Sequence, residues 1–275
     1  MAEACVSMKE KLNISVDDVH NPIFISINTF LDRLYTNKIG IRMISDQHLY
    51  VYGYERVRPN NVGIIKPNCN LTSVLVDALD DATFEIESIY GAAPKVDIQV
   101  VHNDKSQSCK LLERCIPPQG HLVPSHLFLI FNEILKNAMR ATVEYHPDSK
   151  DDLPAISAIV CQAEENDFTI KISDYGGGMD RESIARCFLY QYTTKPSIPN
   201  NNLLGYGLPL ARLYARYFDG DLRLTSYQVI FFIKQFDINC FYYFFRDMEQ
   251  TCTSTFVPSP APHARGFLCT IERAH

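Results

Sequence analysis

The stretch FTIKISDYGGGMD (residues 168–180) alternates apolar and polar residues up to Asp174 and then carries three consecutive glycines. Alternation of this kind predicts a strand over Phe168–Asp174 that buries one of its faces. Glycine has no Cβ and lets a backbone approach a flat ligand closely, while Asp174 can only accept hydrogen bonds, for example from an exocyclic amino group such as that of adenine. The same residues are equally typical of a glycine-rich turn beside a solvated carboxylate.

Strands and helices are predicted to alternate on both sides of this segment. Strand patterns cover Ala155–Gln162 and Asp221–Tyr227. Helical patterns cover about Ser125–Tyr145, with Ser125 as a capping residue, and about Arg181–Tyr190. This order predicts a sheet that is covered by helices on one face, which is an α/β sandwich.

The residues before this region are patterned mostly as helices. FLDRLYTNKIGIRM (residues 30–43) approximates a buried stripe made of Phe30, Leu31, Leu34, Ile39, Ile41 and Met43. Another amphipathic helix follows Asn70, which is a good capping residue. Pro117-Pro118-Gln119-Gly120 is the clearest break in the chain. We therefore predict an α+β protein with a helical, bundle-type domain over residues 1–117, the sandwich over 118–227 and a divergent segment over 228–275.

Composition excludes several classes of protein. The chain has 275 residues, a net charge of −6 and 46% hydrophobic residues, which is typical of a globular protein with about two domains. Mild acidity without a basic stripe argues against binding to nucleic acid, and no apolar run is long enough to predict a membrane span. Nine scattered cysteines are typical of reduced thiols inside a cell. The acidic, arginine-free N-terminus does not look like a transit peptide.

The predicted helix over residues 125–145 collects four polar side chains on one face. Glu133, Asn137 and Arg140 lie within a narrow arc, with Lys136 beside them. An Asn oxygen can bind Mg²⁺, and a Glu one turn earlier can accept a proton or hold a metal-bound water. An amphipathic helix with a solvated polar face has the same pattern, so this helix alone decides nothing.

A second glycine motif, Gly205-Tyr206-Gly207-Leu208-Pro209, opens a further helix. Pro209 suits the first turn of that helix, and Gly220 suits its C-terminal stop. Glycines before a helix leave the N–H groups of its first turn accessible to phosphates, although helices often begin with glycine for other reasons. Thr193-Thr194-Lys195, on the preceding loop, offers hydroxyl and ammonium donors.

The order and spacing of the three motifs resemble one ATPase superfamily. E-x-x-K-N, D-x-G-G-G 41 residues after Glu133, and G-x-G-L-P 31 residues after Asp174 look like its N, G1 and G2 boxes. That superfamily unites bacterial histidine kinases, type II topoisomerases, a heat-shock chaperone and mismatch-repair ATPases. Within it, KNAMRATVE (136–144), YTTKP (192–196), GYGLPLARLYARYF (205–218) and FLDRLYTNKIGIRM look like the mitochondrial 2-oxo acid dehydrogenase kinases. The resemblance covers about residues 24–226.

This resemblance implies a histidine-kinase-like ATPase sandwich that binds ATP and Mg²⁺ and phosphorylates a serine. Glu133 would be the general base that orients the serine hydroxyl of the dehydrogenase E1 alpha subunit. Asn137 would bind Mg²⁺, with Lys136 and Arg140 near the phosphates. Asp174, beside Gly176 and Gly178, would recognise adenine through a hydrogen bond. The nucleotide lid would be formed by Thr193, Thr194, Leu204, Gly205, Tyr206, Gly207 and Leu208.

The resemblance also implies a place and partners. The family acts in the mitochondrial matrix, its helical domain binds the lipoyl domain of the E2 core, and its C-terminal tail crosses to the other subunit of a homodimer. HLVPSHLF (121–128) and LARLYARYFDGDL (210–222) look more like the pyruvate dehydrogenase kinases. EILKNAMRA (133–141) and YGAAPKV (90–96) lean towards the branched-chain 2-oxo acid dehydrogenase kinase. We expect the pyruvate dehydrogenase kinase.

Four departures from the family pattern put activity in question. Leu129 stands where most pyruvate dehydrogenase kinases have a histidine one turn before the base, and His126, on the same predicted face, is two turns from Glu133. Leu203 replaces the first glycine of the lid. About a hundred N-terminal residues of the family, including part of the lipoyl-binding bundle, have no counterpart here. From Gln228 onward the family pattern is lost, so Val229–Phe236 either completes the sheet with a different sequence or is an artefact.

Three hypotheses follow from these features. The first is an active serine kinase, which the intact Glu133, Lys136, Asn137 and Asp174 favour. The second is an ATP-binding remnant that transfers no phosphate, which Leu129 and the altered C-terminus favour. The third is a histidine kinase, which is disfavoured because no phospho-acceptor histidine motif precedes Glu133.

Overall fold

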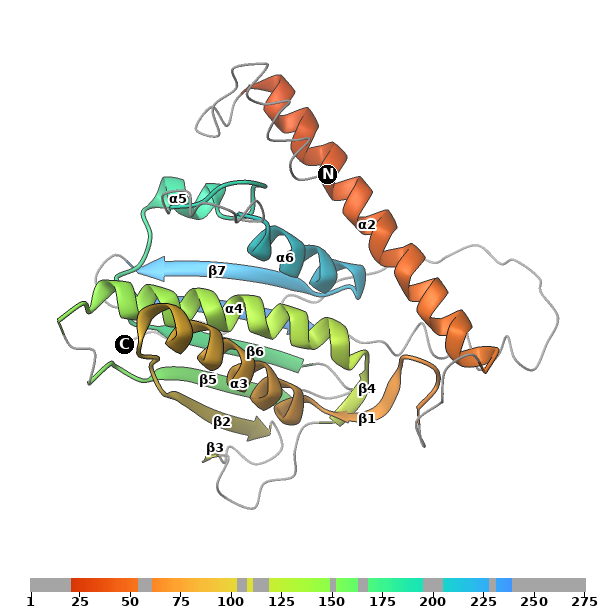
Figure 1. Cartoon of the computed structure of the whole chain (residues 1–275), viewed down its shortest axis with the longest axis horizontal. Coiled ribbons are helices and arrows are strands. Elements are labelled where there is room, and N and C mark those ends of the chain that lie inside the picture. Colours follow the sequence, from red (N-terminus) through yellow and green to blue (C-terminus); the bar gives the residue numbers. More distant parts are fainter. Residues whose placement is uncertain are drawn as a thin grey trace. The chain divides into compact units, whose positions relative to one another are not determined.

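The computed structural model describes residues 21–53, 61–102, 108–110, 119–148, 152–162, 168–194, 205–227 and 231–238 (Figure 1). All of them lie within one compact unit, residues 1–241. The helices are α2 (Pro22–Val51), α3 (Leu71–Tyr90), α4 (Pro124–Tyr145), α5 (Arg181–Arg186) and α6 (Gly207–Tyr217). The strands are β1 (Lys66–Asn70), β2 (Val96–His102), β3 (Ser108–Lys110), β4 (Gln119–Leu122), β5 (Ile156–Gln162), β6 (Phe168–Asp174), β7 (Asp221–Tyr227) and β8 (Phe231–Ile238).

Six of these strands form one sheet in the order β3-β2-β5-β6-β8-β7, and β1 pairs with β4 separately. Within the larger sheet β2 and β5 are parallel, and the other neighbours are antiparallel. Along β6 every second residue, from Phe168 to Asp174, is buried, and the residues between them are half-buried. Figure 1 shows α3 and α4 in front of β5 and β6. The protein is therefore α+β, with an N-terminal helix and an α/β sandwich, as the sequence predicted.

Several predicted elements are confirmed. β6 and β7 have the predicted bounds, and β5 begins one residue later than expected. Asn70 caps α3, because its side chain accepts a hydrogen bond from Ser73 N at 3.2 Å. β8 lies between β6 and β7, so residues 231–238 complete the sheet despite their unfamiliar sequence.

Other boundaries differ from the prediction. Ser125 does not cap α4, which begins at Pro124 after Val123, where proline fixes the φ that a first turn needs. α5 ends at Arg186, four residues short of the predicted end. The left-handed residue after α6 is Asp219, with φ of 60°, and Gly220 only donates its N–H to Ala215 O.

The prediction of a mostly helical N-terminal region is wrong for β1, β2 and β3. β2 belongs to the main sheet, and α3 packs against α4. The division of the chain at residue 117 stays a prediction. The predicted buried stripe on α2 is only partly right, because Leu31, Ile39 and Met43 are buried whereas Phe30 and Ile41 are 61% and 66% exposed. None of the helices that the structure describes combines the length and apolar character needed to cross a bilayer.

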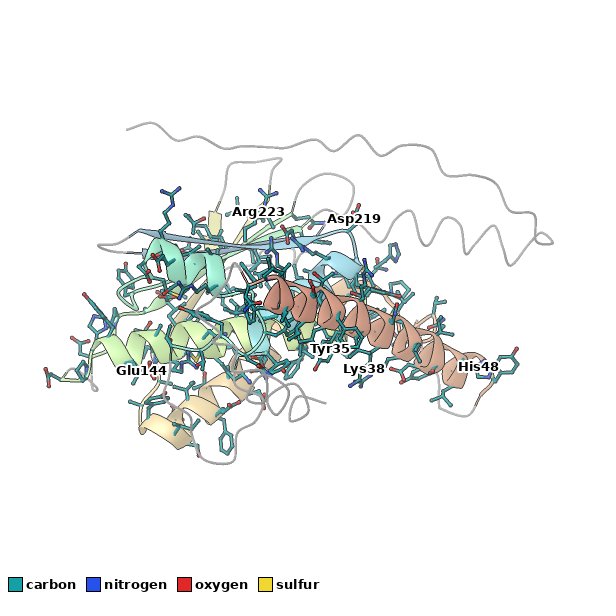
Figure 2. All side chains as sticks on the ribbon, turned by 90° about the horizontal axis from the view of Figure 1, so that it is seen from above. Tyr35, Lys38, His48, Glu144, Asp219 and Arg223 are labelled. Atoms are coloured by element: carbon teal, nitrogen blue, oxygen red, sulfur yellow. The ribbon has the colours of Figure 1, made fainter. Side chains whose placement is uncertain are left out.

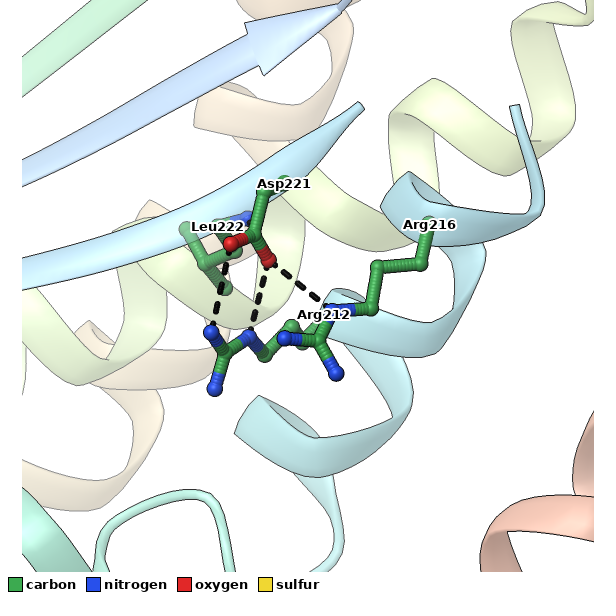
Figure 3. Close-up of polar contacts among 4 residues, drawn as sticks. All are labelled: Arg212, Arg216, Asp221 and Leu222. Carbon is green, nitrogen blue, oxygen red and sulfur yellow. Dashed lines mark hydrogen bonds and ion pairs between the residues drawn. The ribbon is translucent and has the colours of Figure 1, made fainter. Parts of the chain in front are cut away.

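Arginine side chains join α6 to the strand that follows it (Figure 3). Arg212 Nε and Nη2 donate to the two carboxylate oxygens of Asp221 at 2.9 and 3.2 Å, and Arg216 Nε lies 3.1 Å from Oδ1. Arg212 also lies over the Phe188 ring, 4.4 Å from its centroid. Charge-assisted pairs of this geometry fix the turn between α6 and β7.

Candidate functional site

The polar face of α4 holds three of the predicted site residues together. Glu133 Oε1 lies 2.9 Å from Lys136 Nζ, and Asn137 Nδ2 donates to the carbonyl of Glu133 at 2.8 Å. These side chains are half-buried, while Ile130, Ile134 and Ala138 on the other face are buried. The amphipathic pattern thus orients a carboxylate, an ammonium and a carboxamide towards one region.

A residue that the sequence analysis missed also takes part in this cluster. Glu85, on α3, lies with its Oε2 3.3 Å from Lys136 Nζ. Burial alone would lower the pKa of Lys136, but the hydrogen bonds and negative charges of Glu133 and Glu85 outweigh it and raise that pKa. Lys136 therefore stays charged between two carboxylates. No sequence signal places Glu85 there, because the packing of α3 on α4 brings it to Lys136.

The predicted G1 motif lies against the C-terminal half of α4. Asp174 is 1% exposed, and its Oδ1 accepts a hydrogen bond from Gly176 N at 3.0 Å. A Cβ on Gly176 would fall 2.4 Å from the Cβ of Ala141, so only glycine fits there. Gly177 and Gly178 have φ of 74° and 75°. Met179 N donates to Ser226 Oγ at 2.8 Å, which fixes the end of this loop to β7.

The predicted G2 motif lies beside Glu133. A Cβ on Gly207 would fall 2.2 Å from Glu133 Oε2, so the carboxylate lies directly against the first residue of α6. Gly205 has φ of 83°, and its carbonyl accepts a hydrogen bond from Gln191 N at 3.0 Å. Leu208 is half-buried in the first turn of α6. The G1 and G2 motifs are thus brought to one helix, α4, about two turns apart along it.

The remaining predicted residues are spread around this centre. Thr193 is half-buried and Thr194 is exposed, and Leu203, Leu204 and Lys195 lie outside the described residues. Arg140 is half-buried one helical turn after Asn137. Burial and the Glu144 hydrogen bond raise the pKa of Tyr90 to about 12, and the charge of Arg140 opposes that rise. Arg140 thus acts on the end of α3.

His126 does not share the polar face of α4, contrary to expectation. It is 7% exposed, and its ring centroid lies 4.9 Å from that of Tyr214 and 5.5 Å from that of Phe218. Burial, and then the charge of Arg42, lowers the pKa of His126 to about 4. Its imidazole therefore belongs to the α4–α6 interface, whereas Leu129, one turn before Glu133, is half-buried.

Contacts from α2 were also not foreseen. Asn28 Oδ1 accepts a hydrogen bond from Tyr190 N at 3.0 Å, and Asp32 Oδ1 accepts one from the Tyr190 hydroxyl at 2.8 Å. Ile27 and Leu31 pack in one cluster with Tyr190 and Tyr206. The FLDRLY sequence predicted a buried stripe and contributed to the family resemblance, but nothing in it reveals a partner 158 residues away.

Oxygen ligands for a divalent cation are limited here. Within the described ranges no three His, Cys, Asp or Glu side chains are grouped so that they could hold a metal ion. The side-chain oxygen of Asn137 is one hard ligand of the type that Mg²⁺ accepts when phosphates and waters supply the others. Such an arrangement fits a cation that arrives together with a nucleotide.

Comparison with known proteins gives two family matches. The family of histidine kinase-, DNA gyrase B- and HSP90-like ATPases matches residues 122–239. The family described as mitochondrial branched-chain alpha-ketoacid dehydrogenase kinase matches residues 1–66. The first match includes all three motifs that gather at α4.

Individual relatives agree with these families. The chain is 40% identical over 233 residues to a mitochondrial pyruvate dehydrogenase (acetyl-transferring) kinase of Ascaris suum, with 82% of this chain and 55% of the relative covered. It is 40% identical over 237 residues to the human isozyme 3 of that kinase, and 41% identical over 233 residues to a probable kinase of Caenorhabditis elegans. These two alignments cover 82% of this chain and 54% of each relative. The chain thus spans about half the length of the curated relatives it matches. With the ATPase motifs assembled around one helix, the chain is similar to the histidine-kinase-like ATPases and, over 82% of its length, to mitochondrial pyruvate dehydrogenase kinases.

Proposed function

We propose that the chain is an ATP-dependent protein serine kinase that phosphorylates the E1 alpha subunit of pyruvate dehydrogenase and so inactivates that complex. The observation that carries the proposal is the approach of both glycine motifs to α4, the helix that bears Glu133, Lys136 and Asn137. Gly176 meets that helix at Ala141, and Gly207 meets it at Glu133. A nucleotide held between the motifs would have its transferable phosphate near the Glu133 carboxylate.

The residues present fit MgATP. Asp174 is a buried acceptor that suits the amino group of adenine, and Gly176 and Gly178 would lie beside the base. The N–H groups at the start of α6, from Gly207 and Leu208, suit phosphate oxygens. Asn137 would hold Mg²⁺, which neutralises phosphate charge when bound. Lys136 and Arg140 would face the phosphates, and Thr193, Thr194 and residues 204–208 would cover them.

Glu133 is the group that we assign to proton transfer. Its carboxylate would orient the acceptor serine hydroxyl and accept its proton as that oxygen forms a bond to the γ-phosphorus and ADP departs. Positioning and charge neutralisation supply most of the catalysis in phosphoryl transfer, so one carboxylate beside the phosphate site suffices. Lys136 Nζ, 2.9 Å from Glu133 Oε1, would hold that carboxylate in place.

The relatives that this chain matches are named mitochondrial kinases, which supports a mitochondrial location. We propose that the protein acts in the mitochondrial matrix, with the pyruvate dehydrogenase complex as its substrate. The lipoyl domain of the E2 core and a second copy of the chain are the further partners that we propose.

Two other functions have a specific observation in their favour. The match of residues 1–66 to the branched-chain 2-oxo acid dehydrogenase kinase favours that dehydrogenase as substrate. Leu129, half-buried one turn before Glu133 where the resemblance predicts a histidine, favours an ATP-binding protein with impaired transfer.

Transfer of labelled phosphate from MgATP to purified pyruvate dehydrogenase E1 and to branched-chain E1, measured side by side, tests these alternatives. We expect labelled phosphate on pyruvate dehydrogenase E1 with the original chain and none with the Glu133→Gln variant. Calorimetry should show that this variant binds nucleotide with unchanged affinity. Label on the branched-chain E1 alone would change the substrate. Intact nucleotide binding without label on either E1 would identify the impaired protein, and Leu129→His should then restore transfer.

A further inference from the structure

The long helix α2 contacts residues that stand just before and just after residues 192–204. These residues, which we call the loop neck, are Tyr190, Gln191, Gly205 and Tyr206. Asn28 holds the backbone of the neck, since its Oδ1 accepts from Tyr190 N while its Nδ2 donates to Phe24 O at 2.9 Å. Both atoms of the Asn28 amide are therefore engaged, and its orientation is fixed. Asn28 and Tyr190 are 8% and 1% exposed, so water cannot readily replace these bonds.

The loop neck is closed by its own hydrogen bonds. Gln191 N donates to Gly205 O, and Gln191 Nε2 donates to the Tyr206 hydroxyl, both at 3.0 Å. A Cβ on Gly205 would fall 2.6 Å from the carbonyl oxygen of Tyr192, which shows how closely the two chain segments approach. Gly207, directly after the neck, lies against Glu133. Displacement of the neck would therefore displace the start of α6.

Aromatic rings join α2 to both sides of this neck. The Tyr35 ring stacks on that of Tyr190 at 5.7 Å between centroids and meets that of Tyr206 edge-on at 6.3 Å. Figure 2 shows Tyr35 midway along α2 and His48 near its C-terminal end. Burial and the Asp32 hydrogen bond raise the pKa of Tyr190, so its hydroxyl keeps the proton that it donates. The contacts thus combine rigid rings with one buried hydrogen bond, from Tyr190 N to Asn28, and one part-buried hydrogen bond, from the Tyr190 hydroxyl to the exposed Asp32.

We propose that Asn28 and Asp32 are positioning residues of the nucleotide site, which act by holding Tyr190 so that the neck presents Gly207 and the first turn of α6 to the nucleotide. This inference rests on the proposed nucleotide site. Neither residue touches the nucleotide; each acts through Tyr190. Nucleotide binding and the docking of α2 are then linked, so that each strengthens the other by the same factor.

The test measures the Kd of MgADP by calorimetry for the full chain, at a temperature where every variant is folded by circular dichroism. Asp32→Ala and Tyr190→Phe remove the same hydrogen bond and leave the ring of residue 190 in place. Each should raise the Kd by roughly five-fold, and the double variant by no more than either alone. Asp32→Asn keeps an acceptor oxygen and should restore an affinity within about two-fold of the original.

Asp46→Ala is the matched control, because Asp46 lies on the same helix as Asp32. Within the part of the chain that the structure describes, its one salt bridge is with Arg42, at 3.5 Å. Asp46→Ala should leave the Kd unchanged. An unchanged Kd in both Asp32→Ala and Tyr190→Phe would overturn the inference and leave the nucleotide site standing. Failure of the unsubstituted chain to bind MgADP would overturn the proposed function and this inference together.

Discussion

The carboxylate of Glu133 lies against the backbone of Gly207, so that a Cβ at position 207 would fall 2.2 Å from Glu133 Oε2. The atom in the way is the end of a flexible side chain, and Glu133 would therefore move while the fold stays intact. Because a displacement of about 1 Å at a catalytic group can cost as much as a hundred-fold in rate, Gly207→Ala should lower phosphate transfer by at least about tenfold. Its melting temperature should stay close to that of the original chain.

Gly40→Ala serves as the control for this variant. A Cβ on Gly40, inside α2, would meet the Tyr217 hydroxyl at 3.4 Å, which is an ordinary contact. It should keep full transfer and gain up to about 1 kcal/mol of stability, because alanine favours helices over glycine. Full transfer by Gly207→Ala in the same assay would contradict the role of Glu133.

Asp174→Asn should reverse the base preference of the nucleotide site. Asn keeps an oxygen that can accept from Gly176 N, which Asp174 bonds at 3.0 Å, but it adds an N–H₂ donor. Such a donor suits the carbonyl of hypoxanthine and not the amino group of adenine. We expect calorimetry to show ATP affinity reduced by about tenfold or more, and inosine triphosphate affinity maintained or increased.

Asp81→Asn provides the comparison for that experiment. Asp81, on α3, accepts a hydrogen bond from Asn132 Nδ2 at 2.8 Å. The same change of carboxylate to amide there should alter neither affinity. If Asp174→Asn binds ATP as tightly as the original chain does, Asp174 does not accept a hydrogen bond from adenine.

Asp221 should stabilise the fold only in its charged form. Burial raises the pKa of Asp221, but the hydrogen bonds and charges of Arg212 and Arg216 outweigh it, so the net pKa is lowered. A lowered folded-state pKa gives stability that is present at neutral pH and lost as pH falls below the ordinary value of about 3.9. Asp221→Asn should therefore cost about 1–3 kcal/mol in urea unfolding at pH 7, and the two proteins should converge in acid.

Asp46→Asn tests whether the stability lost in Asp221→Asn comes from the geometry of the arginine pairs around Asp221 and not from the loss of a negative charge alone. The pair of Asp46 with Arg42 is exposed and spans 3.5 Å, so removal should cost less than about 1 kcal/mol. An equal loss in both variants would show that the paired arginines around Asp221 add nothing.

His126 should make the protein less stable in mild acid. Its pKa of about 4 in the folded state lies below the ordinary value of about 6.5. The unfolded chain therefore takes up a proton in this window and the folded chain does not, so stability falls as pH falls from about 6.5 towards 4, by up to about 3 kcal/mol. His126→Phe keeps a ring against Tyr214 and should flatten this slope in urea titrations. A slope that persists unchanged would assign the effect to other groups.

Local patterns predicted those elements whose burial repeats regularly along the chain. β6 and β7 have the bounds that alternation predicted, and α4 keeps the predicted polar face. β2 was missed although Val96, Ile98 and Val100 alternate after Pro94, because the surrounding helical patterns dominated the interpretation. Phe30 and Ile41 lie off the 3.6-residue stripe through Leu31 and Met43, which explains their exposure.

The site was predictable as a set of motifs but not as a set of contacts. Spacing along the chain brought Glu133, Asp174 and Gly207 into one family pattern. The ion pair of Lys136 with Glu85 and the contact of Asn28 with Tyr190 depend on how separate helices pack. No single-sequence pattern encodes such long-range contacts, and His126 shows the converse, a polar residue that packing draws into the interior.

The place of β8 in the sheet has a consequence for how the protein is made. β8 is the last described strand in the chain, yet it lies between β6 and β7 and pairs with both. During synthesis both strands therefore leave the ribosome before their shared partner, with open edges that can pair with other chains. Completion of the sheet must wait for residues 231–238, and a chain that stops at residue 227 should aggregate during translation in vitro where the longer chain stays dispersed.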